Sequence, residues 1–317
     1  MYSAIRRLWS VLLGLVLVAA ASGCTGADAE SDGSVSETLN VVCTTGQIAD
    51  MLQNLGGEHV EVEALMGPGV DPHTYKATPS DVRKLNAADV VFYNGMHLEG
   101  RLADLLVAMA RKKPTFAVTE GLQQSADSRL REPPEFAGHY DPHVWHDAAL
   151  WGECVRYATE KLVEIDAAHR QAYETNRDAY IARLAELDEE AKHMLSTVDK
   201  DRRVLVTAHD AFGYFGQAYD VEVHGLQGIS TVDEPDVASM ERLVTILVDR
   251  QIKAVFVESS VPPRNVQALI EACAAQGHEV RIGGELYSDA MGEAGTPEGT
   301  YVGMFRHNVV TVVDALK

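Results

Sequence analysis

Short β-branched runs alternate with stretches of helical character from Leu39 onward. The first series of these runs reads LNVVCTT, VEVEALM, DVVFYNG and TFAVTE, and the second reads RRVLVTAH, VEVHGLQG, KAVFVESS and EVRIGGEL. Strands that alternate with helices are typical of parallel sheets covered by helices on both faces. The pattern therefore predicts an α/β fold with two lobes, each built on a mainly parallel four-stranded sheet flanked by helices.

A long polar stretch without proline or glycine separates the two series. Its apolar residues recur every three, four or seven positions: Tyr173, Tyr180, Leu184, Leu187, Ala191, Met194 and Val198. This spacing predicts one face of a single helix, and such a helix would be roughly 50 Å long at 1.5 Å per residue. We therefore expect an N-terminal lobe at residues 39–165, a linking helix at 166–198 and a C-terminal lobe at 199–317.

Residues 1–23 have the pattern of an export signal. Arg6 and Arg7 precede an apolar run that ends in small residues before Cys24, and this run is too short and wrongly flanked for a spanning helix. A cysteine after small residues resembles a lipoprotein processing site, with ordinary secretion and a nearby cut as the alternative. We expect lipidation at Cys24, a polar tether at residues 24–38, and an exported protein that is lipid-anchored, periplasmic or on the outer cell surface.

Composition narrows the possible partners. The formal charge of −20 becomes −22 without the two arginines of residues 1–23, and such a surface repels nucleic acid. The remaining cysteines, Cys43, Cys154 and Cys273, are far apart and lie in apolar contexts without a CxxC pair. They favour core packing over metal binding, and one disulfide among them stays open.

Metal-binding side chains follow several of the predicted strands. Ligands in parallel α/β sheets bind beyond the carboxyl ends of the strands, where His73, His209 and Asp289 are found. His143 has no strand directly before it, but it shares the triplet Asp-Pro-His with His73. Proline restricts the backbone of such a loop, and we hypothesise that the aspartate orients the imidazole. Three imidazoles and one carboxylate are a suitable donor set for a divalent transition metal. These four residues are far apart in the sequence, so they could meet only between the two lobes.

Several motifs together resemble the metal-binding solute-binding proteins of ABC importers, the cluster nine family, and most of all its TroA-like branch. They read GVDPHTYKATPSDVRKLNAADVVFYNGMHLEG, DPHVW, VLVTAHDAFGYF, VEVHGLQGIS, VFVESSVPPRNV and GGELYSDAMGEAGTPEGTYVGMFRHN. The resemblance covers residues 39–317 and implies two α/β lobes joined by one long helix, with metal buried between them. Position by position, it implies that the metal ligands are His73, His143, His209 and Asp289.

The resemblance also implies a cargo and partners. Relatives that favour manganese or iron often carry glutamate at the position of His209, so three histidines and one aspartate resemble the zinc-binding type. Nitrogen donors also suit zinc. Many zinc-specific relatives have a long histidine-rich loop before the second ligand, whereas the stretch here is short and holds only His139. We therefore expect zinc first and manganese second, delivered by a monomer to an ABC permease and its ATPase subunit.

Two other function classes compete with metal transport. A metallohydrolase would leave one coordination position open for water, but the chain has no HExxH, GxSxG or Rossmann glycine motif. A surface adhesin would be compatible with lipidation, but it would not need a four-ligand site. We therefore expect a protein that is not an enzyme.

Other polar residues near the motifs are expected to have other roles. The resemblance gives His146 no ligand role, and we expect it at the rim of the site or in packing. His139 is expected to be exposed, with a first contact to incoming metal as the alternative. Glu258 ends a predicted strand, and we expect it to cap a helix or anchor a loop.

Overall fold

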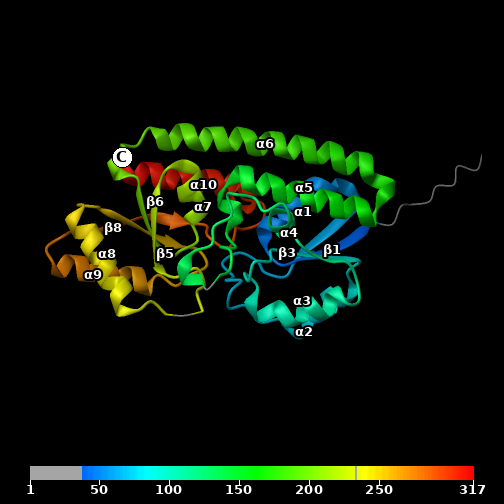
Figure 1. Ribbon diagram of the computed structural model, residues 1–317, viewed down its shortest axis with the longest axis horizontal. Helices are drawn as coiled ribbons and strands as arrows, with labels where there is room; N and C mark the ends of the chain where they lie inside the picture. The colour runs from blue at the N-terminus through cyan, green and yellow to red at the C-terminus, as the bar shows by residue number, and fades with distance from the viewer. Residues whose placement is uncertain (1–37, 137, 233) are drawn as a thin grey trace, which may run out of the picture. The chain divides into compact units, whose positions relative to one another are not determined.

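Strands and helices follow the order expected from the sequence in the computed structural model of the chain (Figure 1). The structure describes residues 38–136, 138–232 and 234–317. The expected export signal, the expected lipidation site at Cys24 and all of the expected tether except Thr38 lie outside these residues. No helix within the described ranges is long and apolar enough to cross a membrane.

The first four strands form one parallel sheet in the order β2-β1-β3-β4. Val41 in β1 pairs with Val62 of β2 and with Val90 of β3. Helix α1 packs on one face of this sheet, and α2 and α3 pack on the other (Figure 1). The central strand β3 is accordingly apolar throughout (VVFY), whereas the edge strand β2 alternates (VEVEA). The elements are β1 (Leu39–Cys43), α1 (Gly46–Gly56), β2 (Val60–Ala64), α2 (Pro79–Ala87), β3 (Val90–Tyr93), α3 (Ala103–Ala110), β4 (Thr115–Ala117) and α4 (Glu120–Gln124).

The last four strands are also parallel, but they form two hydrogen-bonded pairs. β5 pairs with β6 and β7 pairs with β8, while β5 packs beside β7 without a ladder between them. The expected strands are therefore present, and the second sheet is divided in the middle. The elements are β5 (Val204–His209), α7 (Gly213–Tyr219), β6 (Glu222–Gln227), α8 (Val237–Asp249), β7 (Ala254–Glu258), α9 (Arg264–Ala275), β8 (Arg281–Leu286) and α10 (Tyr301–Leu316).

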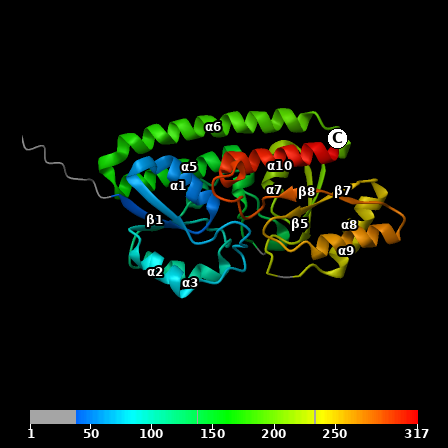
Figure 2. The same ribbon diagram turned by 180° about the vertical axis from the view of Figure 1, so that it is seen from behind.

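The long helix expected at residues 166–198 is α6 (Arg170–Ser196), which follows α5 (Ala148–Ile165) and a 3₁₀ turn at Ala167–His169. Figures 1 and 2 show it running past elements from both halves of the chain. The Tyr180 hydroxyl donates to Asp50 of α1 at 2.9 Å, and the Tyr219 hydroxyl of α7 donates to Asp188 at 3.0 Å. Helix α6 is therefore fixed to both halves.

The buried face of α6 matches the expected one except near its end. Leu195 is fully buried, whereas Met194, which the spacing placed on this face, is only half-buried. The two neighbours differ by about 100° around the helix, so the exact boundary of the face depends on what packs there. Here the sequence pattern alone placed the boundary wrongly.

One large hydrophobic core runs through both halves of the chain. It includes Val41 of β1, Trp151 of α5, Leu184 of α6 and Phe305 of α10. Two smaller cores lie at the outer faces of the sheets, one under α2 and α3 and the other under α8 and α9. Because the halves share their main core, a wide separation of the two would expose packed apolar surface and is strongly disfavoured.

The three described cysteines are core residues, as expected. Cys43, Cys154 and Cys273 are buried and form no disulfide with one another. Burial raises the pKa of the thiols of Cys43 and Cys154, so both stay protonated and unreactive at neutral pH. The possibility of one disulfide among them is therefore closed in this structure.

Candidate metal centre

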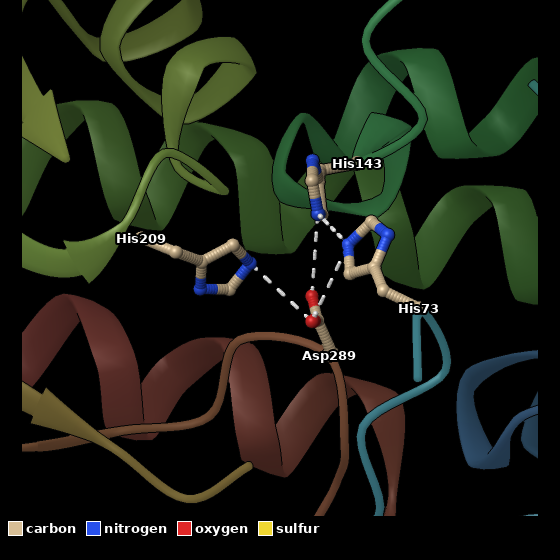
Figure 3. Close-up of side chains that lie close together, drawn as sticks. All are labelled: His73, His143, His209 and Asp289. Atoms are coloured by element: carbon tan, nitrogen blue, oxygen red, sulfur yellow. Dashed lines mark hydrogen bonds and ion pairs between the residues drawn. The ribbon is translucent and has the colours of Figure 1, made fainter. Parts of the chain in front are cut away.

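Four buried side chains from distant parts of the chain converge at one point (Figure 3). His73 lies in the loop after β2, and His143 directly precedes a 3₁₀ turn at Val144–His146. His209 is the last residue of β5, and Asp289 lies three residues beyond β8. Each side chain offers one ligand atom, and these atoms lie within 4.8 Å of one another. The structure therefore brings together all four residues that the sequence singled out.

The distances within this cluster suit a small cation. Nε2 of His143 lies 3.3 Å from Nε2 of His73 and 3.3 Å from Oδ1 of Asp289. Oδ2 of Asp289 lies 3.3 Å from Nε2 of His209 and 3.7 Å from Nε2 of His73. Tetrahedral coordination at 2.0–2.1 Å places neighbouring ligand atoms about 3.3 Å apart. The contacts of Asp289 involve both of its carboxylate oxygens, so these separations suit a small cation held by all four residues without selecting one coordination geometry.

Hydrogen bonding leaves the ligand atoms available for such an ion. Among the described residues, both carboxylate oxygens of Asp289 and Nε2 of His209 have no hydrogen-bond partner outside the cluster itself. Buried polar atoms without partners are costly, and their grouping around one point indicates a bound ligand. A divalent cation would satisfy these atoms together.

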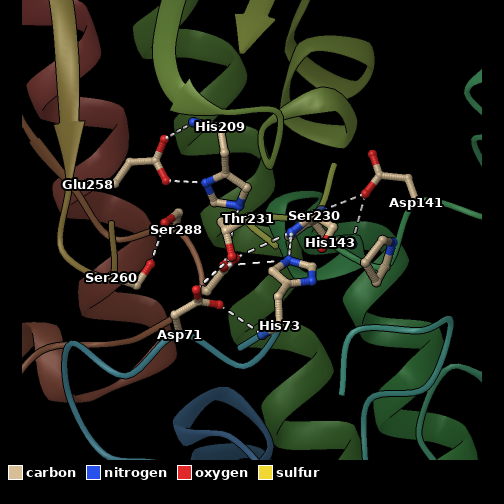
Figure 4. Close-up of polar contacts among 12 residues, drawn as sticks. Asp71, His73, Asp141, His143, His209, Ser230, Thr231, Glu258, Ser260 and Ser288 are labelled. Carbon is tan, nitrogen blue, oxygen red and sulfur yellow. Dashed lines mark hydrogen bonds and ion pairs between the residues drawn. The ribbon is translucent and has the colours of Figure 1, made fainter. Parts of the chain in front are cut away.

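The two Asp-Pro-His triplets share a turn but differ at the ring. The carboxylate of Asp71 accepts from the backbone N–H of His73 at 2.8 Å, and that of Asp141 accepts from the backbone N–H of His143 at 3.0 Å. Asp141 also lies 2.7 Å from Nδ1 of His143 (Figure 4), which holds the ring so that Nε2 faces the cluster. The hypothesis of an aspartate that orients the imidazole is confirmed for His143 and is wrong for His73, where Asp71 instead accepts from two threonine hydroxyls.

Glu258 orients His209, a role that the sequence did not predict. Its carboxylate accepts from the backbone N–H of His209 at 2.9 Å and is hydrogen-bonded to Nδ1 of the ring (Figure 4). The expectation of a helix cap was wrong, whereas the expectation of a loop anchor was right in part. Glu258 ends β7 next to β5, so the adjacency of two parallel strands was the signal for this contact.

The electrostatics of the metal-free cluster distinguish its histidines. Burial lowers the pKa of His73 to about 4, against an opposing effect of Asp289. Burial also acts to lower the pKa of His143, but its contacts with Asp141 and Asp289 outweigh this and raise the pKa to about 9. His209 is affected in the same way by Glu258 and Asp289, which raise its pKa well above the usual value. The raised pKa values favour the imidazolium form, protonated on both nitrogens, for His143 and His209 at neutral pH in the absence of metal.

The neighbouring histidines lie outside the cluster. His146 is fully buried, with its ring centroid 4.3 Å from that of Phe212, and burial lowers its pKa to about 3. It is therefore a packing residue and not a rim residue. His139 is exposed, and its ring lies 4.0 Å from that of His97.

Replacement of Glu258 by glutamine is expected to weaken zinc binding ten- to hundredfold, the usual cost of losing an outer partner of a ligand histidine. The amide keeps the size of the side chain but removes the charge that fixes the His209 ring. Competitive titration against a chromogenic chelator measures the effect. Glu285→Gln changes an exposed carboxylate on the adjacent strand and serves as the matched control. Equal affinities of Glu258→Gln and the wild type would rule out this role of Glu258.

Comparisons with known proteins agree with the geometry. The family model described as "Zinc-uptake complex component A periplasmic" (ZnuA) matches residues 41–315. The "Manganese-binding lipoprotein MntA" of Bacillus subtilis is 46% identical, over 92% of this chain and 95% of its own length. The "Zinc-binding protein TroA" of Treponema pallidum is 42% identical, over 98% of both chains.

Solved structures show the same relationship. The structure of the periplasmic zinc-binding protein TroA from Treponema pallidum superimposes with a TM-score of 0.84 and 44% identity, over 88% of this chain and 99% of that one. The Fe(III)-bound YtgA of Chlamydia trachomatis shares the fold, with a TM-score of 0.79 at 23% identity. The family match over nearly all of the described chain, together with these relatives, establishes that the protein belongs to the ZnuA/TroA family of metal-binding, solute-binding proteins of ABC importers.

Proposed function

We propose that the protein is an extracytoplasmic solute-binding protein that captures a divalent transition metal and delivers it to the permease and ATPase of an ABC importer. The observation that supports this function is the buried group of three histidines and one aspartate, contributed in equal parts by the two halves of the chain. The halves are the proposed lobes at residues 39–165 and 199–317, with the linking helix between them. His73, His143, His209 and Asp289 are the proposed ligands.

Zinc is the proposed cargo, with manganese as the second candidate. One relative is named for manganese and another, of similar identity, for zinc, so the relatives alone do not choose between the two metals. Three of the four side chains offer nitrogen, and sites with such donors bind zinc more tightly than manganese in the Irving–Williams order. The donor set therefore favours zinc.

The proposed place of the protein is outside the cytoplasmic membrane, held by a lipid at Cys24. Several relatives are named as lipoproteins. In this chain the small residues before Cys24 and the polar stretch after it fit a lipid-modified cysteine followed by a tether. One folded body on such a tether needs no second copy to complete its metal site, so we propose that the protein acts as a monomer.

Capture and release are proposed to involve a small movement. The metal needs donors from both lobes, so its binding draws the ligand loops together. The shared hydrophobic core and the attachment of α6 to both halves oppose a wide opening. The loops that carry the ligands, rather than whole lobes, therefore account for most of the movement when metal passes to the permease.

The two other function classes find no support. The family consists of substrate-binding proteins and not of enzymes, so a metallohydrolase is not indicated. A surface adhesin would leave the buried ligand cluster without a purpose. Transport therefore accounts for more of the observations than either alternative.

Zinc is expected to raise the melting temperature of chelator-stripped protein by about 8 °C or more. Ligand that binds only the folded state stabilises it by about 4 kcal/mol at a thousand times the dissociation constant, and a chain of this size gains about 2 °C per kcal/mol. Calorimetry with and without zinc measures the shift, and competition between zinc and manganese ranks the two metals.

Magnesium is the control ion for this experiment, because it prefers oxygen ligands and retains its waters. It is expected to leave the melting temperature unchanged. An unchanged melting temperature with both zinc and manganese would contradict a metal site that joins the two halves. Elemental analysis of protein purified from its native host would then identify what the protein carries.

A further inference from the structure

The carboxylate of Asp71 lies where loops from the two halves of the chain meet (Figure 4). Within its own loop it accepts from the backbone N–H of His73 at 2.8 Å and from the hydroxyl of Thr74 at 2.8 Å. From the other half it accepts from the hydroxyl of Thr231, in the segment after β6, at 2.6 Å. One carboxylate thus joins the backbone of His73 to Thr231, which lies 160 positions after Asp71 in the chain.

The other ligand loop of the N-terminal half is held by a denser set of contacts. The Tyr214 hydroxyl donates to the carbonyl of Asp141 at 2.9 Å, the Trp145 indole donates to the carbonyl of Ser288 at 2.9 Å, and the Tyr301 hydroxyl donates to the carbonyl of Trp145 at 2.7 Å. These bonds are buried and fix the segment around His143 to the C-terminal half. The loop that carries His73 is therefore the better candidate for the part that moves when metal leaves.

We propose that Thr231 is a positioning residue for metal retention. Its hydroxyl holds the His73 loop against the C-terminal half through its hydrogen bond to Asp71, which we call the latch. The inference rests on the proposed function. The hydrogen bond crosses between the halves and forms only while the loops are together, so it adds to the stability of the metal-loaded arrangement. Asp71 also holds the backbone of His73, so loss of the latch frees the carboxylate and the ligand to move as one unit. The effect falls on metal release rather than on metal capture.

The chain offers a matched pair of hydroxyls for the test. Thr74 and Thr231 both donate to Oδ2 of Asp71, but only the bond from Thr231 crosses between the halves. Valine has the shape of threonine without the hydroxyl, so Thr231→Val and Thr74→Val each remove one donor to the same oxygen. Thr231→Ser keeps the donor and is the rescue variant.

The experiment loads each variant with zinc and mixes it with an excess of a fluorescent chelator in a stopped-flow instrument. Thr231→Val is expected to release zinc about tenfold faster than the wild type, as suits the loss of a hydrogen bond to a charged group. Its association rate, measured with zinc in excess, is expected to be unchanged. Thr231→Ser and Thr74→Val are expected to release zinc at nearly the wild-type rate.

Three results would overturn the latch. Release from Thr231→Val at the wild-type rate would show that the bond does not retain metal. If Thr74→Val accelerated zinc release as much as Thr231→Val does, the hydrogen bond between the two halves would have no special role. If Thr231→Val lowered the melting temperature of the metal-free protein as much as that of the zinc-bound protein, the hydroxyl would be a general structural contact. Failure of the wild type to bind zinc or manganese would instead refute the proposed function, so the two failures are distinguishable.

Discussion

His143→Ala is expected to lower the zinc affinity by more than about a hundredfold, so that the purified protein no longer retains one zinc per chain. The imidazole of His143 is fixed by Asp141 and lies 3.3 Å from both His73 and Asp289, at the middle of the ligand cluster. Its removal costs more than the ten- to hundredfold that follows loss of an outer partner. Elemental analysis after gel filtration, together with chelator competition, measures the loss.

His146→Phe is the matched control for this prediction, because it changes a histidine three residues away. The His146 ring packs on Phe212, and neither of its nitrogens has a hydrogen-bond partner among the described residues. Phenylalanine keeps the aromatic packing and removes two unsatisfied polar atoms, each of which costs about 1–3 kcal/mol when buried. Zinc retention is expected to stay at one per chain. Equal losses in the two variants would mean that the assignment of His143 over His146 is incorrect.

Much of the secondary structure could be predicted because the central strands are buried on both faces. β3 reads as the unbroken apolar run VVFY, and its neighbours Val90 and Val91 belong to different cores on the two faces of the sheet. Helix α6 was predictable for a different reason, since only one of its faces is buried and its apolar residues recur at helical spacing. The pairing of β5 to β8 into two separate ladders could not be predicted, because pairing depends on contacts between strands and not on the pattern within one.

The candidate site was predictable to the extent that ligands follow strand ends. His209 and Asp289 lie at or just beyond the ends of β5 and β8, and His73 lies in the loop after β2. His143 was indicated by its repeated triplet and by the family resemblance. The role of these four residues as metal ligands stays a prediction, although the structure brings them together.

The residues that hold the ligands were harder to predict. Glu258 is hydrogen-bonded to His209, and Thr231 to Asp71 next to His73, over separations of 49 and 160 positions in the chain. Their roles follow from which strands and loops become neighbours. A pattern along one sequence does not contain that information. The contact between Asp141 and the His143 ring could be predicted because the two residues are only two positions apart.

Zinc affinity is expected to rise steeply with pH between about 6 and 8, by up to a hundredfold per pH unit. His143, with a pKa of about 9, and His209, with a raised pKa, each hold a proton in the metal-free protein at neutral pH. That proton must leave before the ring nitrogen can bind zinc, and each proton displaced changes the affinity about tenfold per pH unit. Asp289, whose pKa is held well below its usual value by His209 and His143 despite burial, releases none.

The direction and the range of the pH dependence of zinc affinity follow from the pKa values of the same histidines. A raised pKa means that protons compete with zinc throughout the range below it, so the contribution of His143 levels off above about pH 9. Below about pH 4, protonation of His73 adds a third competitor.

Calorimetry at pH 7 in two buffers of different ionisation enthalpy is expected to count one to two protons released per zinc. Asp141→Asn removes the carboxylate that raises the pKa of His143, so it should release fewer protons. An affinity that is flat from pH 6 to 8 would mean that the metal-free histidines are already neutral. The raised pKa values of His143 and His209 lead us to expect that zinc binds by replacing a proton on each of these rings.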